Sequence, residues 1–249
     1  MRSLDQMIAD VSEIGGYFHL YTSQAPPGPW LPLSRLLADS DAFGERISAA
    51  CDLLGTGERR VIASVLHLGI AARLWSPVLG AAVAHRVLLD WTADDLEWKD
   101  ALGGPLPLRL PAPSGQPVAD LSEAAEPLYR SVSALLEQLS DLVLSQVKLA
   151  PRLLWGNAAS ALGGTVRALA RERPEHSADA LALGDLLLGL GELRGTGGFA
   201  EPAPGRLFFT RTSCCLYYRI PGGGKCGDCA LTDPADRRAQ WAQALKENP

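Results

Sequence analysis

The 249-residue sequence lacks the signatures of several classes of protein. None of its apolar runs reaches the roughly 18 residues that a membrane span requires, and no basic region followed by a long apolar stretch opens the chain. We therefore expect no transmembrane segment, no signal peptide and a cytoplasmic location. Acidic residues outnumber basic ones, 28 to 23, and this balance argues against a nucleic-acid partner.

Motifs for nucleotide binding and for acid–base catalysis are missing as well. The glycines of GTGG (195–198) lack the GxGxxG spacing and the following GKS or GKT of phosphate-binding loops, so we expect no bound NAD(P)H or flavin. The four histidines show no metal-ligand spacing, and the sequence offers no catalytic triad or paired-carboxylate motif. Any redox reaction therefore needs electrons from an external donor, such as a ferredoxin or a flavin-dependent reductase.

Apolar residues make up 47% of the chain and recur mostly at helical spacing, which predicts a substantial helical core. The predicted helices cover residues 41–55, 58–73, 78–89, 120–148, 151–173 and 178–190, and a short one starts at Asp233-Pro234. Short strands are expected on either side of Gly103-Gly104 and in RLFFTRT (206–212), whereas 111–119 and 193–199 are expected to be loops. The fold class is thus α+β, with a mainly helical body over 1–205, a small β element, and a C-terminal segment with a terminal helix over 206–249.

Cysteine is scarce, yet four of the five cysteines lie within RTSCCLYYRIPGGGKCGDCAL (211–231). They are Cys214, Cys215, Cys226 and Cys229, with the spacing C-C-x10-C-x2-C. A CxxC turn lets two thiolates converge on a metal. Disulfides are unusual in a reducing compartment, and a chain with a large core does not need them.

The adjacent pair discriminates further between metal centres. Neighbouring side chains of a regular strand point to opposite faces, so two adjacent ligands need a bent backbone or a centre with more than one metal atom. Zinc sites usually take their ligands from spaced knuckles. The pattern therefore favours a 2Fe–2S cluster, and a structural zinc site held by the four cysteines is the alternative.

Basic residues surround the cysteines. Residues 206–229 contain Arg206, Arg211, Arg219 and Lys225 against a single acid, Asp228. Nearby cations favour the more negative, reduced form of a 2Fe–2S cluster and so raise its potential. They would also attract anionic substrates, which makes Arg211, Arg219 and Lys225 candidates for substrate binding.

With these features, SCCLYYRIPGGGKCGDC resembles the iron–sulfur segment of the FhuF-type ferric-siderophore reductases. The upstream stretches RLWSPV (73–78) and LLWGNAASAL (153–162) are similar to other segments of that family. The resemblance implies that all four motif cysteines bind a 2Fe–2S cluster. It also implies a cytoplasmic reductase that passes one electron to ferric iron in an imported siderophore, often a hydroxamate, and releases ferrous iron. The helical body would then bind the siderophore.

Several residues and functions remain open at this point. Arg73 and Trp75 are candidates to line a siderophore pocket, although Arg73 could equally cap its helix. Asn157 either bonds across a packing interface or holds the cysteine loop, and Cys51 is expected to be a buried structural thiol. The alternative functions are a non-enzymatic iron–sulfur electron-transfer or sensor protein and a structural zinc protein. If the cluster binds, the simplest pairing puts the two adjacent cysteines on one iron and the CxxC cysteines on the other.

Overall fold

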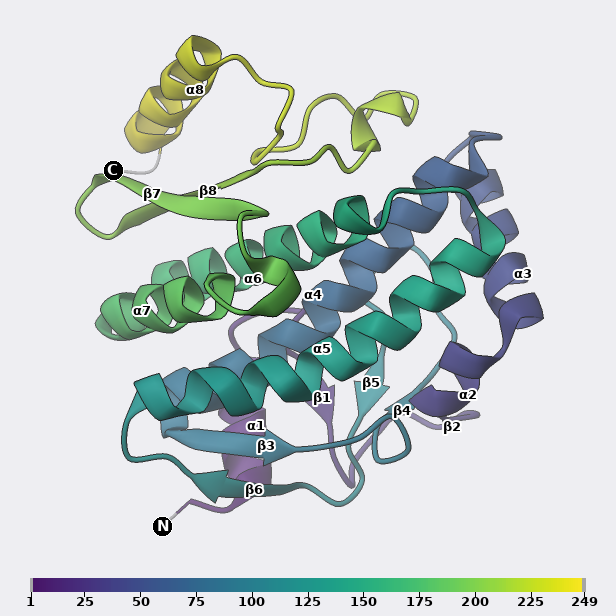
Figure 1. Cartoon of the computed structure of the whole chain (residues 1–249). Coiled ribbons are helices and arrows are strands. Elements are labelled where there is room, and N and C mark those ends of the chain that lie inside the picture. Colours follow the sequence, from purple (N-terminus) through teal and green to yellow (C-terminus); the bar gives the residue numbers. More distant parts are fainter. Residues whose placement is uncertain (1, 248–249) are drawn as a thin grey trace.

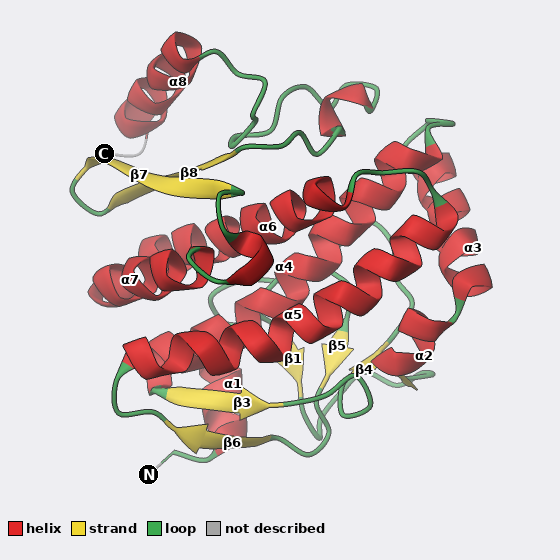
Figure 2. Ribbon diagram, viewed as in Figure 1, coloured by secondary structure: helices red, strands yellow, loops and turns green. Residues whose placement is uncertain are grey.

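The computed structural model describes residues 2–247 and has the expected α+β class, with long helices and small sheets at the edges (Figures 1 and 2). The helices are α1 (Leu4–Ser12), α2 (Leu33–Ala38), α3 (Ser40–Leu53), α4 (Arg59–His85), α5 (Leu121–Gln146), α6 (Pro151–Glu172), α7 (Ser177–Leu188) and α8 (Pro234–Glu247). The strands are β1 (Leu20–Tyr21), β2 (Leu31–Pro32), β3 (Val87–Asp90), β4 (Glu97–Trp98), β5 (Leu108–Arg109), β6 (Ser114–Pro117), β7 (Gly197–Ala203) and β8 (Arg206–Arg211). Short 3-10 turns are η1 (Pro174–His176), η2 (Gly191–Leu193) and η3 (Tyr217–Arg219).

Helix α4 is the centre of the body and packs along α6, α5 and α1. It runs unbroken through Pro77, so the prediction of two helices in this region is wrong. Proline inside a helix removes one hydrogen bond and costs about 3 kcal/mol. The next two side chains, Val78 and Leu79, are fully buried, and burial of such side chains gains about 1.5–3 kcal/mol each. Tertiary packing therefore outweighs the local penalty.

By length and composition α4 could also cross a membrane. Its most apolar 18-residue window has a mean hydropathy of 1.5, but 72% of that window is buried inside the protein. Such hydropathy is what a central core helix requires, so it does not by itself indicate a membrane span.

The other helix boundaries follow local signals. Gly55 has a φ of +63° in the loop between α3 and α4, a conformation that favours glycine. The side chain of Asp120 accepts a hydrogen bond from the backbone of Ser122 at the start of α5, and Asp233 caps α8 through Ala235 in the same way. These predicted starts are confirmed.

The small sheets confirm the predicted hairpin and the predicted strand in RLFFTRT, and they correct three other predictions. Strands β4 and β5 pair as the predicted antiparallel hairpin, with Glu97 opposite Arg109. The supposed loop 111–119 contains β6, which pairs antiparallel with β3, where a helix was predicted. Helix α4 ends at His85, and its capping residue Arg86 adopts a left-handed conformation with a φ of 54°, where the chain turns into β3. In the glycine-rich stretch 193–199, strand β7 already begins at Gly197.

The C-terminal part begins with the β7–β8 hairpin, which lies against α6 (Figure 1). Glycines permit this contact: a Cβ atom on Gly163 would lie 2.4 Å from the Phe209 ring, and one on Gly156 would lie 1.9 Å from Ser213 Oγ. The small residues of α6 therefore let β8 and the following residues approach the helix closely. The predicted division at residue 206 falls between β7 and β8, which share one set of ladder hydrogen bonds.

Candidate metal centre

The cysteines lie in an irregular segment between β8 and α8, which we call the cysteine segment (residues 212–233). Cys215 and Cys229 are buried, whereas Cys214 and Cys226 are partly exposed. Directly after the adjacent pair, Leu216 takes a left-handed conformation with a φ of 68°. This is rare for a residue with a side chain, and it supplies the backbone bend that two adjacent ligands need.

Side chains of the helical body hold both halves of the cysteine segment. The Ser64 hydroxyl on α4 donates to the backbone carbonyl of Cys215 at 2.8 Å. The Ser160 hydroxyl on α6 donates to the Asp228 carboxylate, inside the CxxC turn, at 2.5 Å. The backbone N–H of Arg211 donates to the carbonyl of Asp228 at 3.2 Å. The end of β8 and the CxxC turn are therefore tied together above α6.

One pair of thiols is already in contact. The Sγ atoms of Cys215 and Cys226 are 3.6 Å apart and form a hydrogen bond. That bond lowers the pKa of Cys215 to about 6 and raises the pKa of Cys226, because it stabilises Cys215 as the thiolate. Burial instead raises the pKa of Cys214. The two halves of the motif thus meet through one cysteine from each.

The thiols of Cys214 and Cys229 each accept a hydrogen bond from the backbone N–H of the residue two positions later in the chain. Leu216 N–H donates to Cys214 Sγ at 3.3 Å, and Leu231 N–H donates to Cys229 Sγ at 3.4 Å. Such N–H donors stabilise sulfur that carries negative charge and are one of the factors that set iron–sulfur potentials. The geometry around both cysteines therefore suits thiolate ligands.

Within residues 2–247, no three His, Cys, Asp or Glu side chains gather closely enough to hold one metal ion. A mononuclear zinc site requires four ligands around a single point. A binuclear cluster instead takes two ligands at each of two irons. One such close pair is present, between Cys215 and Cys226.

Unsatisfied donors near the cysteines give an independent test of fit. Among the described residues, Ser213 Oγ and two guanidinium nitrogens of Arg211 are buried without a hydrogen-bond partner. Buried polar groups are nearly always bonded, so three such donors just before the cysteine pair are unusual. An anionic cluster beside them would accept these bonds, and the residues present therefore fit such a group.

The five proposed substrate residues fall into a buried and an exposed group, and Arg211, which is 1% exposed, belongs to the buried one. Arg73 is 1% exposed and donates to backbone carbonyls of residues 16, 17, 19 and 106, and Trp75 is fully buried in α4. Neither side chain has a surface that a ligand can reach, so we remove both from the candidate site. Arg219 and Lys225 remain on the exposed side of the cysteine segment, where Arg219 pairs with Glu58 at 2.7 Å and Lys225 donates to the carbonyl of Leu231.

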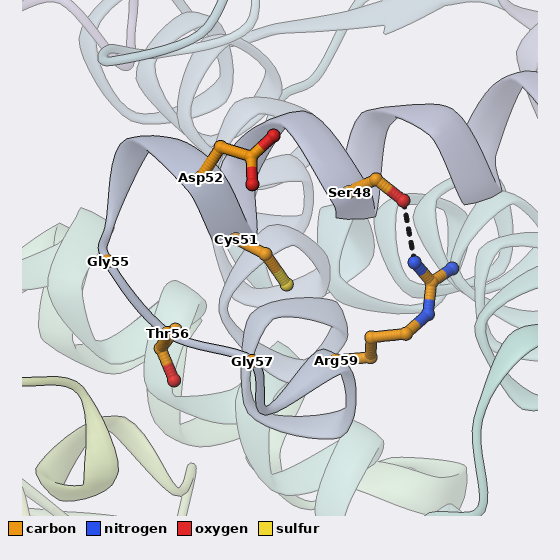
Figure 3. Close-up of a pocket in the computed structure, with 7 residues that line it drawn as sticks. All are labelled: Ser48, Cys51, Asp52, Gly55, Thr56, Gly57 and Arg59. Carbon is orange, nitrogen blue, oxygen red and sulfur yellow. Dashed lines mark hydrogen bonds between the residues drawn. The ribbon is translucent and has the colours of Figure 1, made fainter.

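A pocket lies at the loop between α3 and α4, next to this ion pair. It has a volume of about 540 Å³ and is lined by Ser48, Cys51, Asp52, Gly55, Thr56, Gly57 and Arg59 (Figure 3). Glu58, between two of the lining residues, is the partner of Arg219, so the pocket adjoins the cysteine segment. The fifth cysteine, Cys51, belongs to this wall; it is buried, and burial raises its pKa.

Sequence reasoning missed Ser64, which lies 151 residues before its partner Cys215. No local sequence pattern indicates that a serine in a buried helix binds the backbone of a distant segment. For Asn157 the sequence left two roles open, a bond across a packing interface and a bond that holds the cysteine loop, and the structure shows both. Its amide donates to Ser64 on α4, and its carbonyl oxygen accepts from Arg211, directly before the cysteine segment.

Comparison with known proteins agrees with this geometry. The family model of the FhuF 2Fe-2S C-terminal domain matches residues 211–231, which include all four clustered cysteines. No curated protein matches the chain. The match names the cofactor of this segment as a 2Fe–2S cluster. Residues 211–231 therefore match an FhuF-type 2Fe–2S C-terminal domain, and the resemblance recognised from the cysteine spacing is confirmed for this segment.

Proposed function

We propose that this protein is a ferric-siderophore reductase whose cluster ligands are Cys214, Cys215, Cys226 and Cys229. The observation that carries the proposal is the C-C-x10-C-x2-C segment, in which all four thiols are free and which matches the FhuF domain. When bound, the 2Fe–2S cluster supplies one electron, which is the difference between ferric and ferrous iron. Ferrous iron binds hard oxygen donors such as hydroxamates more weakly than ferric iron does, so reduction releases the metal.

The chain protects one side of the cysteine segment and leaves the other accessible. Cys215 and Cys229 are buried against the body, whereas Cys214 and Cys226 reach the surface. This difference in burial would shield a bound cluster from water on the side of Cys215 and Cys229, and would let a substrate approach it on the side of Cys214 and Cys226. No general acid or base is required of the protein, because the reaction at iron is an electron transfer followed by ligand exchange.

We further propose that Cys215 and Cys226 share one iron. Two thiolates on one tetrahedral metal ion, with metal–sulfur bonds of about 2.3 Å, lie about 3.8 Å apart. In the structure these two sulfurs are 3.6 Å apart. This pairing takes one cysteine from each half of the motif, unlike the simple pairing by neighbours in sequence.

The pocket of Figure 3 is where we propose that the chelate binds. Its volume of about 540 Å³ suits a small molecule, and the ion pair between Glu58 and Arg219 places it beside the cysteine segment. Arg59 offers a cation and Thr56 a hydroxyl to hydroxamate oxygens. Gly57 has open space around its Cα, so Gly57→Trp should raise the half-saturating chelate concentration without changing the cluster spectrum, whereas Gly104→Trp should change neither. An unchanged half-saturating concentration in Gly57→Trp would place the chelate elsewhere.

An external protein, such as a ferredoxin or a flavin-dependent reductase, would supply the electrons, and we place the reaction in the cytoplasm. Support for an external donor comes from the missing nucleotide-binding loop. Exposed Tyr217 and Tyr218 on the cysteine segment suit a protein contact, because tyrosine is enriched at interfaces.

The proposal is tested with protein reduced anaerobically and mixed with a ferric hydroxamate. We expect the visible bands of the cluster to return to their oxidised form at a rate that saturates with chelate, while a chromogenic chelator traps ferrous iron. Cys226→Ser should lose the cluster and this reaction, whereas Cys51→Ser should keep the cluster, because Cys51 lies on α3 away from the motif. A stable cluster that is not oxidised by any ferric chelate would instead indicate an electron-transfer or sensor protein. A colourless protein with one zinc would contradict both readings.

A further inference from the structure

Arg211 is the last residue of β8 and precedes the adjacent cysteines by three positions. Its side chain is 1% exposed, which makes it one of the largest fully buried side chains of the protein. One terminal nitrogen, Nη2, donates to the carbonyl oxygen of Asn157 at 2.5 Å. Among residues 2–247, Nε and Nη1 have no hydrogen-bond partner, and none of the ion pairs includes this arginine.

The other fully buried arginine shows what a purely structural role looks like. Arg73 uses three nitrogens to donate to four backbone carbonyls, which bind the N-terminal segment to α4. Guanidinium has five N–H donors, and in Arg73 most of them are used. In Arg211 most are not. Because arginine stays charged even when buried, this site keeps a positive charge without a negative partner.

The surroundings of Arg211 limit what that partner can be. The nearest acid of the segment, Asp228, is already engaged by the hydroxyl of Ser160. His67 lies close enough to feel the charge of Arg211 but is itself held neutral by burial. Arg211 ends β8 three residues before Cys214, and its backbone N–H donates to the carbonyl of Asp228, the residue before Cys229. The free positive charge therefore acts on the cysteines.

We propose that Arg211 is a positioning residue that serves as the fixed counter-charge of the 2Fe–2S cluster and raises its reduction potential. This inference rests on cluster binding at the four cysteines but not on the identity of the electron acceptor. Two ferric ions, two sulfides and four thiolates sum to two negative charges, and one added electron makes three. A buried cation therefore stabilises the reduced form more than the oxidised form.

A continuous set of hydrogen bonds fixes the charge relative to the cysteines. The carbonyl oxygen of Asn157 accepts from Arg211, and its amide donates to Ser64, where both the carbonyl and the hydroxyl oxygen are 2.9 Å away. The Ser64 hydroxyl donates in turn to the backbone carbonyl of Cys215. Helices α4 and α6 thus hold the guanidinium and the cysteine backbone in one rigid unit, and such preorganisation makes a charge effective.

The test is a redox titration of purified holoprotein, followed by the visible spectrum, without any ferric chelate. We expect Arg211→Met to shift the equilibrium toward the oxidised cluster at least tenfold, which is about 59 mV for a one-electron couple. Arg211→Lys keeps the charge and should lose less than half of that shift. Arg219→Met is the matched control. It removes one positive charge from the cysteine segment itself, but Arg219 is exposed and already paired with Glu58, so the potential of this variant should stay close to that of the wild type.

A second readout on the cluster-free protein separates this role from packing. Because Arg211→Met removes an unpaired buried charge, it should raise the urea midpoint of reduced, cluster-free protein while lowering the potential of the loaded one. A packing role would lower the urea midpoint and leave the potential unchanged, which would overturn the proposal. So would equal potential shifts in Arg211→Met and Arg219→Met, or loss of the cluster from both folded Arg211 variants. Loss from Arg211→Met alone would support it.

This test and the test of the proposed function fail in different ways. If wild-type protein shows the cluster and the predicted shift but does not reduce ferric chelates, the reductase proposal fails and the role of Arg211 stands. If chelates are reduced and the potential does not depend on Arg211, the reductase proposal stands and the proposed role of Arg211 fails.

Discussion

His67 is a completely buried base near the cluster site. Its Nε2 meets Ser140 at 3.2 Å, and its Nδ1 has no partner among the described residues. Burial, with a smaller contribution from the charge of Arg211, lowers the pKa of His67 to about 3. The unfolded chain therefore takes up a proton below its ordinary pKa of 6.5 while the folded chain does not, and stability is lost as the pH falls from about 6.5 toward 3.

This pKa shift predicts a specific pH dependence. Between pH 7 and pH 5, His67 should cost about 2 kcal/mol of unfolding free energy. Urea unfolding of reduced, cluster-free protein measures the loss. Because other groups titrate as well, His67→Gln serves as the reference. Between pH 7 and pH 5, this variant should lose about 2 kcal/mol less unfolding free energy than the wild type. Equal slopes for the two proteins would show that the imidazole is protonated in the folded state.

The contact between Cys215 and Cys226 predicts the first product of oxidation once the cluster is lost. Only this pair of motif thiols forms a sulfur–sulfur contact within residues 2–247, with its sulfurs 3.6 Å apart. We expect mild oxidation of cluster-free protein to give mainly a disulfide between Cys215 and Cys226, as found by peptide mapping. A predominant link within the CxxC turn would argue against the proposed sharing of one iron, and Cys51 should remain free in either case.

At the scale of elements, the contact between α6 and β8 depends on Gly163. A Cβ atom at this position would collide with the ring of Phe209, whereas one on the neighbouring Gly164 would meet nothing within 4 Å. Gly163→Ala should therefore lower the free energy of unfolding by about 1–3 kcal/mol. Gly164→Ala should raise it by about 0.5–1 kcal/mol, because alanine favours the helix more than glycine does. Urea unfolding of the two variants checks the pair, and stabilisation by both would mean that β8 does not approach α6 so closely.

Helix starts and stops were largely predictable because their signals are local. Asp120 and Asp233 cap helices through bonds to residues two positions on. The continuation of α4 through Pro77 and the pairing of β3 with β6 were not predictable in this way. Both depend on contacts with distant parts of the chain, in which burial outweighs a local preference.

At the scale of the whole molecule, the cysteine segment differs from the body that carries it. The body has one continuous apolar core, whereas the cysteine segment contributes little to it beyond Ile220 and Leu216. Regular structure between β8 and α8 is limited to η3. Segments with few buried apolar contacts open locally at low cost.

This difference predicts the pattern of hydrogen exchange. In cluster-free protein, amides of the cysteine segment should exchange fast while those of α4 and α6 stay protected, and cluster loading should protect the segment selectively. Mass spectrometry of the two forms measures this, and it also tests the proposed division of the chain near residue 206. Equal protection of the segment in both forms would mean that it folds as part of the body without its cofactor.

The candidate site shows the same balance between local and distant information. Cysteine spacing lies within one short segment, so the sequence alone predicted the cofactor and the family resemblance. Arg73 and Arg211 were both candidates for substrate binding, and only the tertiary structure separates an anchor with most of its donors bonded from a buried charge without an ionic partner. The anchoring chain through Ser64 and Asn157 joins residues of α4, α6 and the C-terminal segment, so no sequence window contains it.

The most direct test of the reductase proposal is a single turnover with a siderophore that carries an enriched iron isotope. Protein with natural-abundance iron in its cluster is reduced anaerobically, freed of reductant and mixed with the labelled ferric hydroxamate. We expect one labelled ferrous ion to be trapped for each cluster oxidised, with the cluster iron retained by the protein. Trapped iron of natural abundance, which would come from breakdown of the cluster, or no labelled ferrous iron beyond the amount that Cys226→Ser releases, would contradict it.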